Sequence, residues 1–132
     1  MSAPLDESLR ERVRSLGRLP LESVVAHGGA GRIDFRRLFE AADFRAPIHF
    51  VDYAVLPPQS SIGTHTHGDN EELYLVLEGR GRMHLDGEDF EVEPGSVILN
   101  RAGGTHGLTN TGAQPLRLFV VEVGLGATEA GA

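Results

Sequence analysis

The stretch GTHTHGDNEELYLVLEG, residues 63–79, brings His65, His67 and Glu72 close together in the chain. Residues two apart on a β-strand project to the same face, roughly 6.6 Å apart along it, so the two imidazoles can hold one ion between them. The Gly-Asp-Asn segment that follows indicates a turn before the glutamate. Because imidazole nitrogen and carboxylate oxygen together bind first-row divalent metals, the stretch predicts a metal site built on β-strands.

A second stretch, GSVILNRAGGTHGLTN, residues 95–110, supplies a third histidine, His106. Together the two stretches resemble the two motifs of the cupin family. The first matches H-x-H, three or four residues, E, six residues, G, and ends at Gly79. The second matches G-x5-P-x-G-x2-H-x3-N and ends at Asn110.

Two positions depart from the family pattern. Arg101 replaces a proline, and Gln59 replaces the glycine expected six residues before the first histidine. Neither departure removes a metal ligand. The resemblance implies one divalent transition metal ion (Fe, Mn, Zn or Ni) with one or two positions open to water or substrate, as in catalytic sites. Its implied ligands are His65, His67, Glu72 and His106.

From Ile33 onward the sequence favours β-structure, with turns rich in glycine and proline between short apolar runs. Strands at this spacing suggest a sandwich or barrel, and the resemblance narrows it to the all-β cupin jelly roll, a double-stranded β-helix. Residues 36–42 are also compatible with a helical turn. The expected strands are 33–39, 48–56, 61–67, 72–77, 82–86, 89–93, 96–100, 105–110 and 116–123.

The chain length indicates one domain. We expect an amino-terminal helix and arm over residues 1–32, the barrel over 33–125 and a flexible tail over 126–132. Apolar residues at helical spacing predict a short helix over residues 5–16, packed on its own domain. The glycine-rich segment at residues 27–31 lacks the lysine and Ser/Thr of a phosphate loop, so we interpret it as a turn and His27 as an ordinary loop histidine.

The strand after residue 70 allows two ligand assignments. If Glu72 points inward, a stripe formed by residues Leu73, Leu75 and Leu77 points outward. If Glu71 is the ligand, the leucines line the interior instead, which hydrophobicity alone favours. The seven-residue step to the motif glycine favours Glu72, and we adopt it. The stripe then needs cover from the amino-terminal segment or from a second subunit, and the resemblance implies a homodimer.

Further residues are candidates for catalysis. Tyr74 shares the face of Glu72, where a phenol can bond the carboxylate or a bound oxyanion, or simply pack. His49 is a candidate for proton transfer, although lone strand histidines such as His49 and His84 are more often structural.

Other residues are candidates for lining a substrate cavity. Arg101 either grips a substrate carboxylate or enolate or is solvated. With Val51 also on the wall, a mainly apolar cavity suits a flat or apolar substrate with one chelating oxygen. The expected substrate contacts are Tyr53, Val76, Arg101 and Leu108.

Composition excludes several classes of protein. The chain has 132 residues and no cysteine, which excludes disulfides and thiolate metal sites. A net charge of −7 argues against nucleic-acid partners. The apolar runs are too short to span a membrane and the charged amino terminus does not resemble a signal peptide, so we expect a cytoplasmic protein.

The expected function is that of a metal-dependent cupin enzyme acting on a small organic substrate. The substrate would offer a chelating carbonyl, enol or carboxylate oxygen, and the reaction would be of the dioxygenase type or of the isomerase, cyclase or lyase type. The alternative is a non-enzymatic cupin that binds a metal or a small ligand. The fold does not choose between them.

Overall fold

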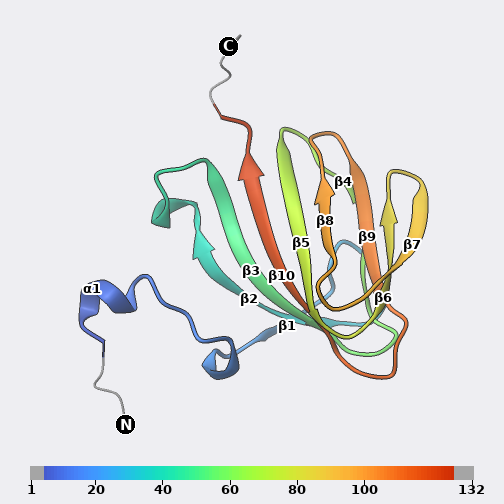
Figure 1. The fold of residues 1–132 in the computed structure, drawn as a ribbon, viewed down its shortest axis with the longest axis horizontal. Coiled ribbons are helices and arrows are strands. Elements are labelled where there is room, and N and C mark those ends of the chain that lie inside the picture. The colour runs from blue at the N-terminus through green and yellow to red at the C-terminus, as the bar shows by residue number, and fades with distance from the viewer. Residues whose placement is uncertain (1–4, 127–132) are drawn as a thin grey trace.

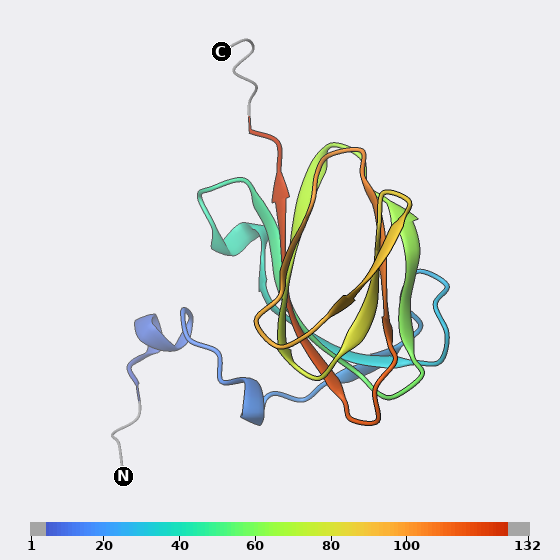
Figure 2. The same cartoon turned by 45° about the vertical axis from the view of Figure 1, so that its right-hand side comes forward.

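The computed structural model describes residues 5–126, and within them ten strands form two antiparallel sheets. Figure 1 shows the strand layout, and Figure 2 shows the two sheets enclosing the interior of a barrel. This arrangement confirms the predicted all-β, double-sheet fold. Within the same residues, no helix is long and apolar enough to cross a membrane.

The larger sheet has six strands in the order β1-β2-β3-β10-β5-β8. They are β1 (Glu22–Val24), β2 (Ile33–Glu40), β3 (Ile48–Leu56), β10 (Leu116–Gly124), β5 (Asn70–Glu78) and β8 (Val97–Asn100). The smaller sheet has the order β4-β9-β6-β7. Its strands are β4 (Ser61–Thr66), β9 (Thr105–Asn110), β6 (Gly81–Leu85) and β7 (Glu88–Val92). The short helical turns are α1 (Glu7–Arg10), η1 (Leu16–Arg18) and η2 (Ala41–Asp43).

All nine predicted strands are present with small shifts at their ends. The β6–β7 hairpin has the predicted Asp86-Gly87 turn, in which both residues have positive φ, 47° and 87°. Such a turn matches the twist of the flanking strands. The helical turn considered for residues 36–42 is present only at Ala41 and Ala42, the first two residues of η2. Strand β1 was missed because its three residues are too few to show an alternating pattern.

The helix predicted over residues 5–16 is wrong in extent, since only Glu7–Arg10 is α-helical. The apolar residues at positions 5, 9 and 13 are exposed, and α1 buries none of its residues. Figure 1 shows α1 set apart from the barrel. Short helices gain most of their stability from packing an apolar face, and this one has no such face packed within the described residues.

The barrel interior changes from polar to apolar along its length. On β5 the inward side chains are Glu72, Tyr74 and Val76, all nearly inaccessible to solvent. Beyond them, Leu108 and Leu118 belong to a fully packed apolar cluster. This cluster closes one part of the barrel and leaves the polar residues together in the other. The proposed tail at 126–132 lies almost wholly outside the described residues.

A second apolar cluster covers the outer face of the larger sheet. It centres on Val51, Tyr53 and Val55 of β3, against which Leu16 and Leu19 of the amino-terminal segment pack. The amino-terminal segment therefore covers the β3 side of the outer face, whereas Leu73 of the expected stripe stays 37% exposed.

Candidate metal centre

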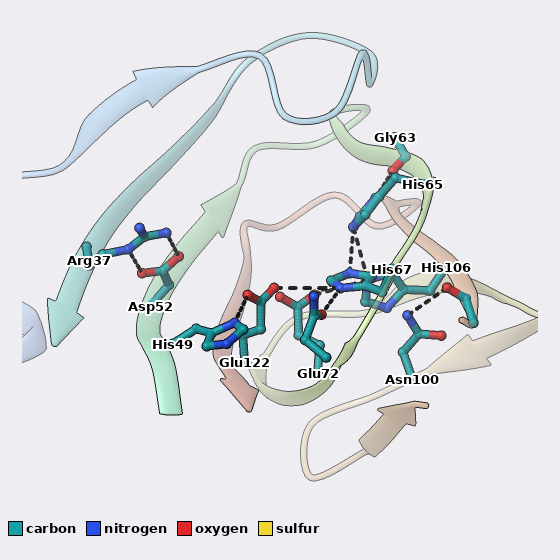
Figure 3. A network of polar contacts seen from close by, with 12 residues as sticks. Arg37, His49, Asp52, Gly63, His65, His67, Glu72, Asn100, His106 and Glu122 are labelled. Carbon is teal, nitrogen blue, oxygen red and sulfur yellow. Dashed lines mark hydrogen bonds and ion pairs between the residues drawn. The ribbon is translucent and has the colours of Figure 1, made fainter. Parts of the chain in front are cut away.

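Four metal-binding side chains converge at the polar end of the barrel. His65 lies on β4 and is paired in register with His106 on β9. His67 follows the end of β4, and Glu72 comes from β5 in the opposite sheet. Figure 3 shows them directed toward one another. Glu72 is 5% exposed and His106 1% exposed, so the cluster is largely withdrawn from solvent.

The donor atoms form a compact set. The Nε2 atoms of the three histidines lie 3.1 Å (His65–His67), 3.0 Å (His67–His106) and 3.1 Å (His106–His65) apart. Glu72 Oε1 lies 3.3 Å from the Nε2 of His67 and 3.0 Å from that of His106. One donor atom of each of the four residues falls within 4.8 Å of all the others.

The other ring nitrogens of His65 and His67 are held by acceptors. His65 Nδ1 donates to the Gly63 carbonyl at 2.7 Å, and His67 Nδ1 donates to the Asn70 side-chain oxygen. A donating Nδ1 carries the ring proton, so each Nε2 presents a lone pair. The Nε2 atoms of His65 and His67 therefore face each other with no proton between them. A bound cation would satisfy these lone pairs, and the donor set fits a divalent transition metal.

Burial shifts the pKa values of three cluster residues. It lowers the pKa of His65 to about 4, with His27 and the other two histidines adding to the effect. It also lowers the pKa of His106 to about 4, with His67 contributing. Burial raises the pKa of Glu72, and the neighbouring His67 opposes that rise. At neutral pH, His65 and His106 are therefore neutral, the form that binds metal.

The structure places Glu72 in this cluster and turns Glu71 outward, where its Oε2 accepts a hydrogen bond from the Ala102 amide at 3.3 Å. The stripe of residues Leu73, Leu75 and Leu77 accordingly faces away from the interior. The Tyr74 ring lies next to the cluster, with its centroid 4.7 Å from the centroid of the His106 ring.

A cavity of about 480 Å³ adjoins the cluster. Most of its wall is apolar and comes from β1, β2, β3 and β10. His67, Glu72 and Tyr74 form part of its polar lining. The apolar wall residues are Val24, Val25, Ala26, Ile33, Phe35, Phe50, Ala54, Ile62 and Val120.

The β3 candidates do not line this cavity. On β3 the even-numbered residues Phe50, Asp52 and Ala54 face it, which directs the odd-numbered ones outward. Tyr53 lies in the outer cluster, where its hydroxyl accepts a hydrogen bond from Arg117 at 2.6 Å. Val51 belongs to the same outer cluster.

The remaining candidates lie at different depths. His49 is largely exposed, but its Nδ1 lies 2.8 Å from Glu122 Oε2 at the edge of the site. Val76 and Leu108 are buried in the packed core beyond the cavity, because the apolar cluster fills that part of the barrel. Arg101 is exposed on the loop before β9.

Two site residues were missed by sequence reasoning. Glu122, opposite Glu72 in register, has its Oε1 3.6 Å from His67 Nδ1. A carboxylate in the apolar strand FVVEV was a usable signal. His27 stacks on His65 and lines the cavity, and no local pattern connects its glycine-rich turn with a site more than thirty residues away.

An ion pair also lies on the cavity wall. Arg37 donates to both carboxylate oxygens of Asp52, at 3.0 and 3.1 Å, and its guanidinium lies 4.1 Å above the Phe50 ring. Burial raises the pKa of Asp52, and Arg37 opposes that rise. Figure 3 shows this pair on the far side of Glu122 from His65, His67 and His106.

Fold and site together define a jelly-roll protein with a His₃Glu cluster. The cupin domain family matches residues 52–122, and the chain belongs to that family. It is 31% identical over 94 residues to an oxalate-binding protein of Thermotoga maritima, covering 71% of this chain and 78% of that protein. It is 29% identical over 85 residues to the polyketide synthase CurC of Streptomyces cyaneus, covering 64% of this chain and 55% of that protein.

Solved structures agree with this membership. The crystal structure of a predicted oxalate decarboxylase from Thermotoga maritima superposes with a TM-score of 0.83 and 28% identity. The match covers 86% of this chain and 99% of that one. The Schizosaccharomyces pombe Cnp3 cupin domain superposes with a TM-score of 0.69 at 15% identity, covering 83% of this chain and 72% of that one, which is a likeness of fold.

Proposed function

We propose that the protein binds one divalent transition metal ion through its His₃Glu cluster and uses it to act on a small organic molecule. The observation that carries the proposal is that the Nε2 lone pairs of His65 and His67 face each other inside a buried cluster. Three imidazoles and a carboxylate left without a cation would keep buried polar atoms short of partners.

The donor spacing fits a single divalent ion held by all four residues. Nitrogen and oxygen donors lie about 2.0–2.2 Å from a divalent ion, so neighbouring donors that share one ion lie roughly 3–4 Å apart. The separations of 3.0–3.3 Å between neighbouring donors fall within this range. These four residues would hold the ion, which would then accept oxygen atoms of a small ligand.

The chain's own residues would hold and shield such a ligand. A bound divalent ion would supply a Lewis acid that polarises a carbonyl, enol or carboxylate oxygen. Burial and the neighbouring Glu72 raise the pKa of Tyr74 well above its usual range, so the phenol stays protonated as a hydrogen-bond donor. The mostly apolar wall would shield an apolar body of the ligand from water. Glu122 lies between His49 and His67.

The cavity indicates the kind of ligand. Its volume of about 480 Å³ lies within the range of roughly 300–1,000 Å³ that holds drug-sized molecules. Oxalate, which the Thermotoga maritima relative is named for binding, fills a small part of that space. We infer a ligand that chelates through one end and lays an apolar body along β2 and β3.

The reaction would be of the dioxygenase type or of the isomerase, cyclase or lyase type. The test begins with elemental analysis of the purified protein, followed by oxygen-uptake and turnover assays with oxalate and with carbonyl and enol compounds bearing aromatic bodies. We expect metal-dependent turnover of a compound larger than oxalate. A rate independent of oxygen would exclude the dioxygenase branch.

The second candidate is a non-enzymatic binding protein, which the name of the Thermotoga maritima relative favours. Tight, metal-dependent binding of one compound without turnover under any metal loading would replace the enzymatic proposal with this one.

A further inference from the structure

His27 lies face to face with the ligand histidine His65. The two ring centroids are 3.5 Å apart and the planes differ by 9°. Aromatic pairs usually adopt offset or edge-on arrangements with centroids 4.5–7 Å apart. A parallel stack this close is therefore imposed by the surrounding chain.

The loop that presents His27 is fastened to β4. The Gly63 amide donates to the Ala26 carbonyl at 2.9 Å, and the Ser61 amide donates to the Ala30 carbonyl at 2.9 Å. His27 itself has a φ of +51°, a value that residues other than glycine rarely adopt. Such a conformation persists only where the surrounding structure determines it.

Two glycines allow this close approach of loop and strand. A Cβ on Gly29 would collide with the Ser61 carbonyl, and a Cβ on Gly63 would collide with the carbonyl of His27. Gly63 is also the residue whose carbonyl accepts the Nδ1 hydrogen of His65. The backbone at Gly63 thus holds the Nδ1 edge of the His65 ring through a hydrogen bond, and its close approach to the loop places His27 against the face of the same ring.

We propose that His27 is a positioning residue for the metal ligand His65, a role that rests on the proposed metal site. The hydrogen bond to Gly63 sets the tautomer of His65 but leaves its ring free to rock about that bond. The stacked ring of His27 blocks this rocking and keeps Nε2 directed at the other three donors. His27 also lines the cavity, so the same residue limits how a ligand approaches His65.

The experiment compares cobalt(II) binding by the wild-type protein, His27→Ala and His27→Phe. Both variants keep a Cβ at the same left-handed backbone position, so they differ in the ring and not in backbone strain. His84→Ala is the matched control, because His84 lies on the outside of the smaller sheet and pairs with Asp89. Dissociation constants come from calorimetry, coordination from the cobalt d–d absorption spectrum, and folding from circular dichroism of the metal-free proteins.

We expect His27→Ala to weaken cobalt binding on the order of 10-fold, the lower end of the range for residues that support a metal ligand. Its d–d spectrum should change, while His27→Phe and His84→Ala should resemble the wild type. Equal affinity and spectrum in His27→Ala and wild type would overturn the role of His27, as would equal losses in the Ala and Phe variants. A wild-type protein that takes up no cobalt would instead overturn the metal site itself.

Discussion

The hydrogen bonds made by the Nδ1 atoms of His65 and His67 determine what the site can bind. Each Nδ1 donates to an oxygen, and each Nε2 therefore faces the cluster as an acceptor. The lowered pKa of His65 keeps a proton from taking the metal's place near neutral pH. At the scale of single residues, the cluster is compatible with a bound metal cation.

Metal loading should therefore depend on individual ligands. His67→Ala removes a donor that contacts all three others and should abolish stoichiometric loading, measured by elemental analysis. Glu72→Gln should weaken loading, because it removes the one negative charge among the donors. Glu71→Gln is the matched control and should load normally, since Glu71 bonds a loop amide outside the cluster. Full metal retention in His67→Ala would refute the ligand assignment.

The metal-free protein should lose stability in mild acid. The pKa of both His65 and His106 is lowered by burial from 6.5 to about 4. Between these pH values the unfolded chain binds more protons than the folded chain, so the free energy of unfolding falls as the pH drops from 6.5 toward 4. The raised pKa of Glu72 works in the opposite direction and offsets part of this loss.

Urea denaturation of chelator-treated protein at about pH 7 and about pH 5 measures the effect. His65→Gln should reduce the pH dependence, whereas the surface variant His84→Gln should retain it. An unfolding free energy that stayed constant between the two pH values would contradict the burial-driven pKa shifts.

Among the structural elements, the loop between β8 and β9 connects the two ligand-bearing segments. The Gly104 carbonyl accepts hydrogen bonds from the His67 amide at 2.9 Å and from the Asn100 side chain at 3.2 Å. Gly103 donates to the Gly68 carbonyl at 3.1 Å. The segment after β4 and the segment before β9 are therefore held together by backbone contacts next to the cluster.

Gly104→Ala should disturb this connection. The added Cβ would collide with Asn100 Oδ1, a buried atom that lacks a hydrogen-bond partner and has little room to move. We expect a loss of about 1–3 kcal/mol in unfolding free energy, typical of overpacking, together with weaker metal binding. Gly112→Ala is the control, because its Cβ would meet neighbours at 3.6 Å or more. Equal stability of the two variants would contradict a tight connection at Gly104.

The elements that sequence analysis predicted well are those with local patterns. Alternation and turn chemistry identified nine strands, and the spacing of two motifs identified the four clustered residues. The extent of the amino-terminal helix and the contact between His27 and His65 depend on how distant segments pack, which no local pattern contains. The placement of Tyr53 failed for a related reason, because strand parity alone does not say which face of β3 is inside.

For the whole molecule, the outer face of the larger sheet is only partly covered. Register pairs Leu73 with Leu99 and Leu75 with Val97, which joins β5 and β8 into one apolar strip. Leu73 is 37%, Leu99 43% and Val97 63% exposed, while Leu77 packs against the outer cluster. The amino-terminal segment covers the β3 side and leaves this strip open.

We therefore expect a homodimer that buries the strip. Light scattering should give the mass of a dimer at micromolar concentration, and Leu99→Glu should shift it toward the monomer by placing a charge in the interface. Phe90→Glu is the control, since Phe90 has similar exposure but lies on β7 of the smaller sheet. A wild-type monomer would contradict the dimer, as would equal effects of the two substitutions.

The clustered side chains come from both sheets, and this has a thermodynamic consequence. His65 and His106 belong to the smaller sheet and Glu72 to the larger, so a bound ion would join the two walls of the barrel as a removable cross-link. By mass action, an ion present at about 100 times its dissociation constant adds roughly 2.7 kcal/mol to the free energy of unfolding. The supply of free metal around the protein would then determine how firmly the barrel stays closed.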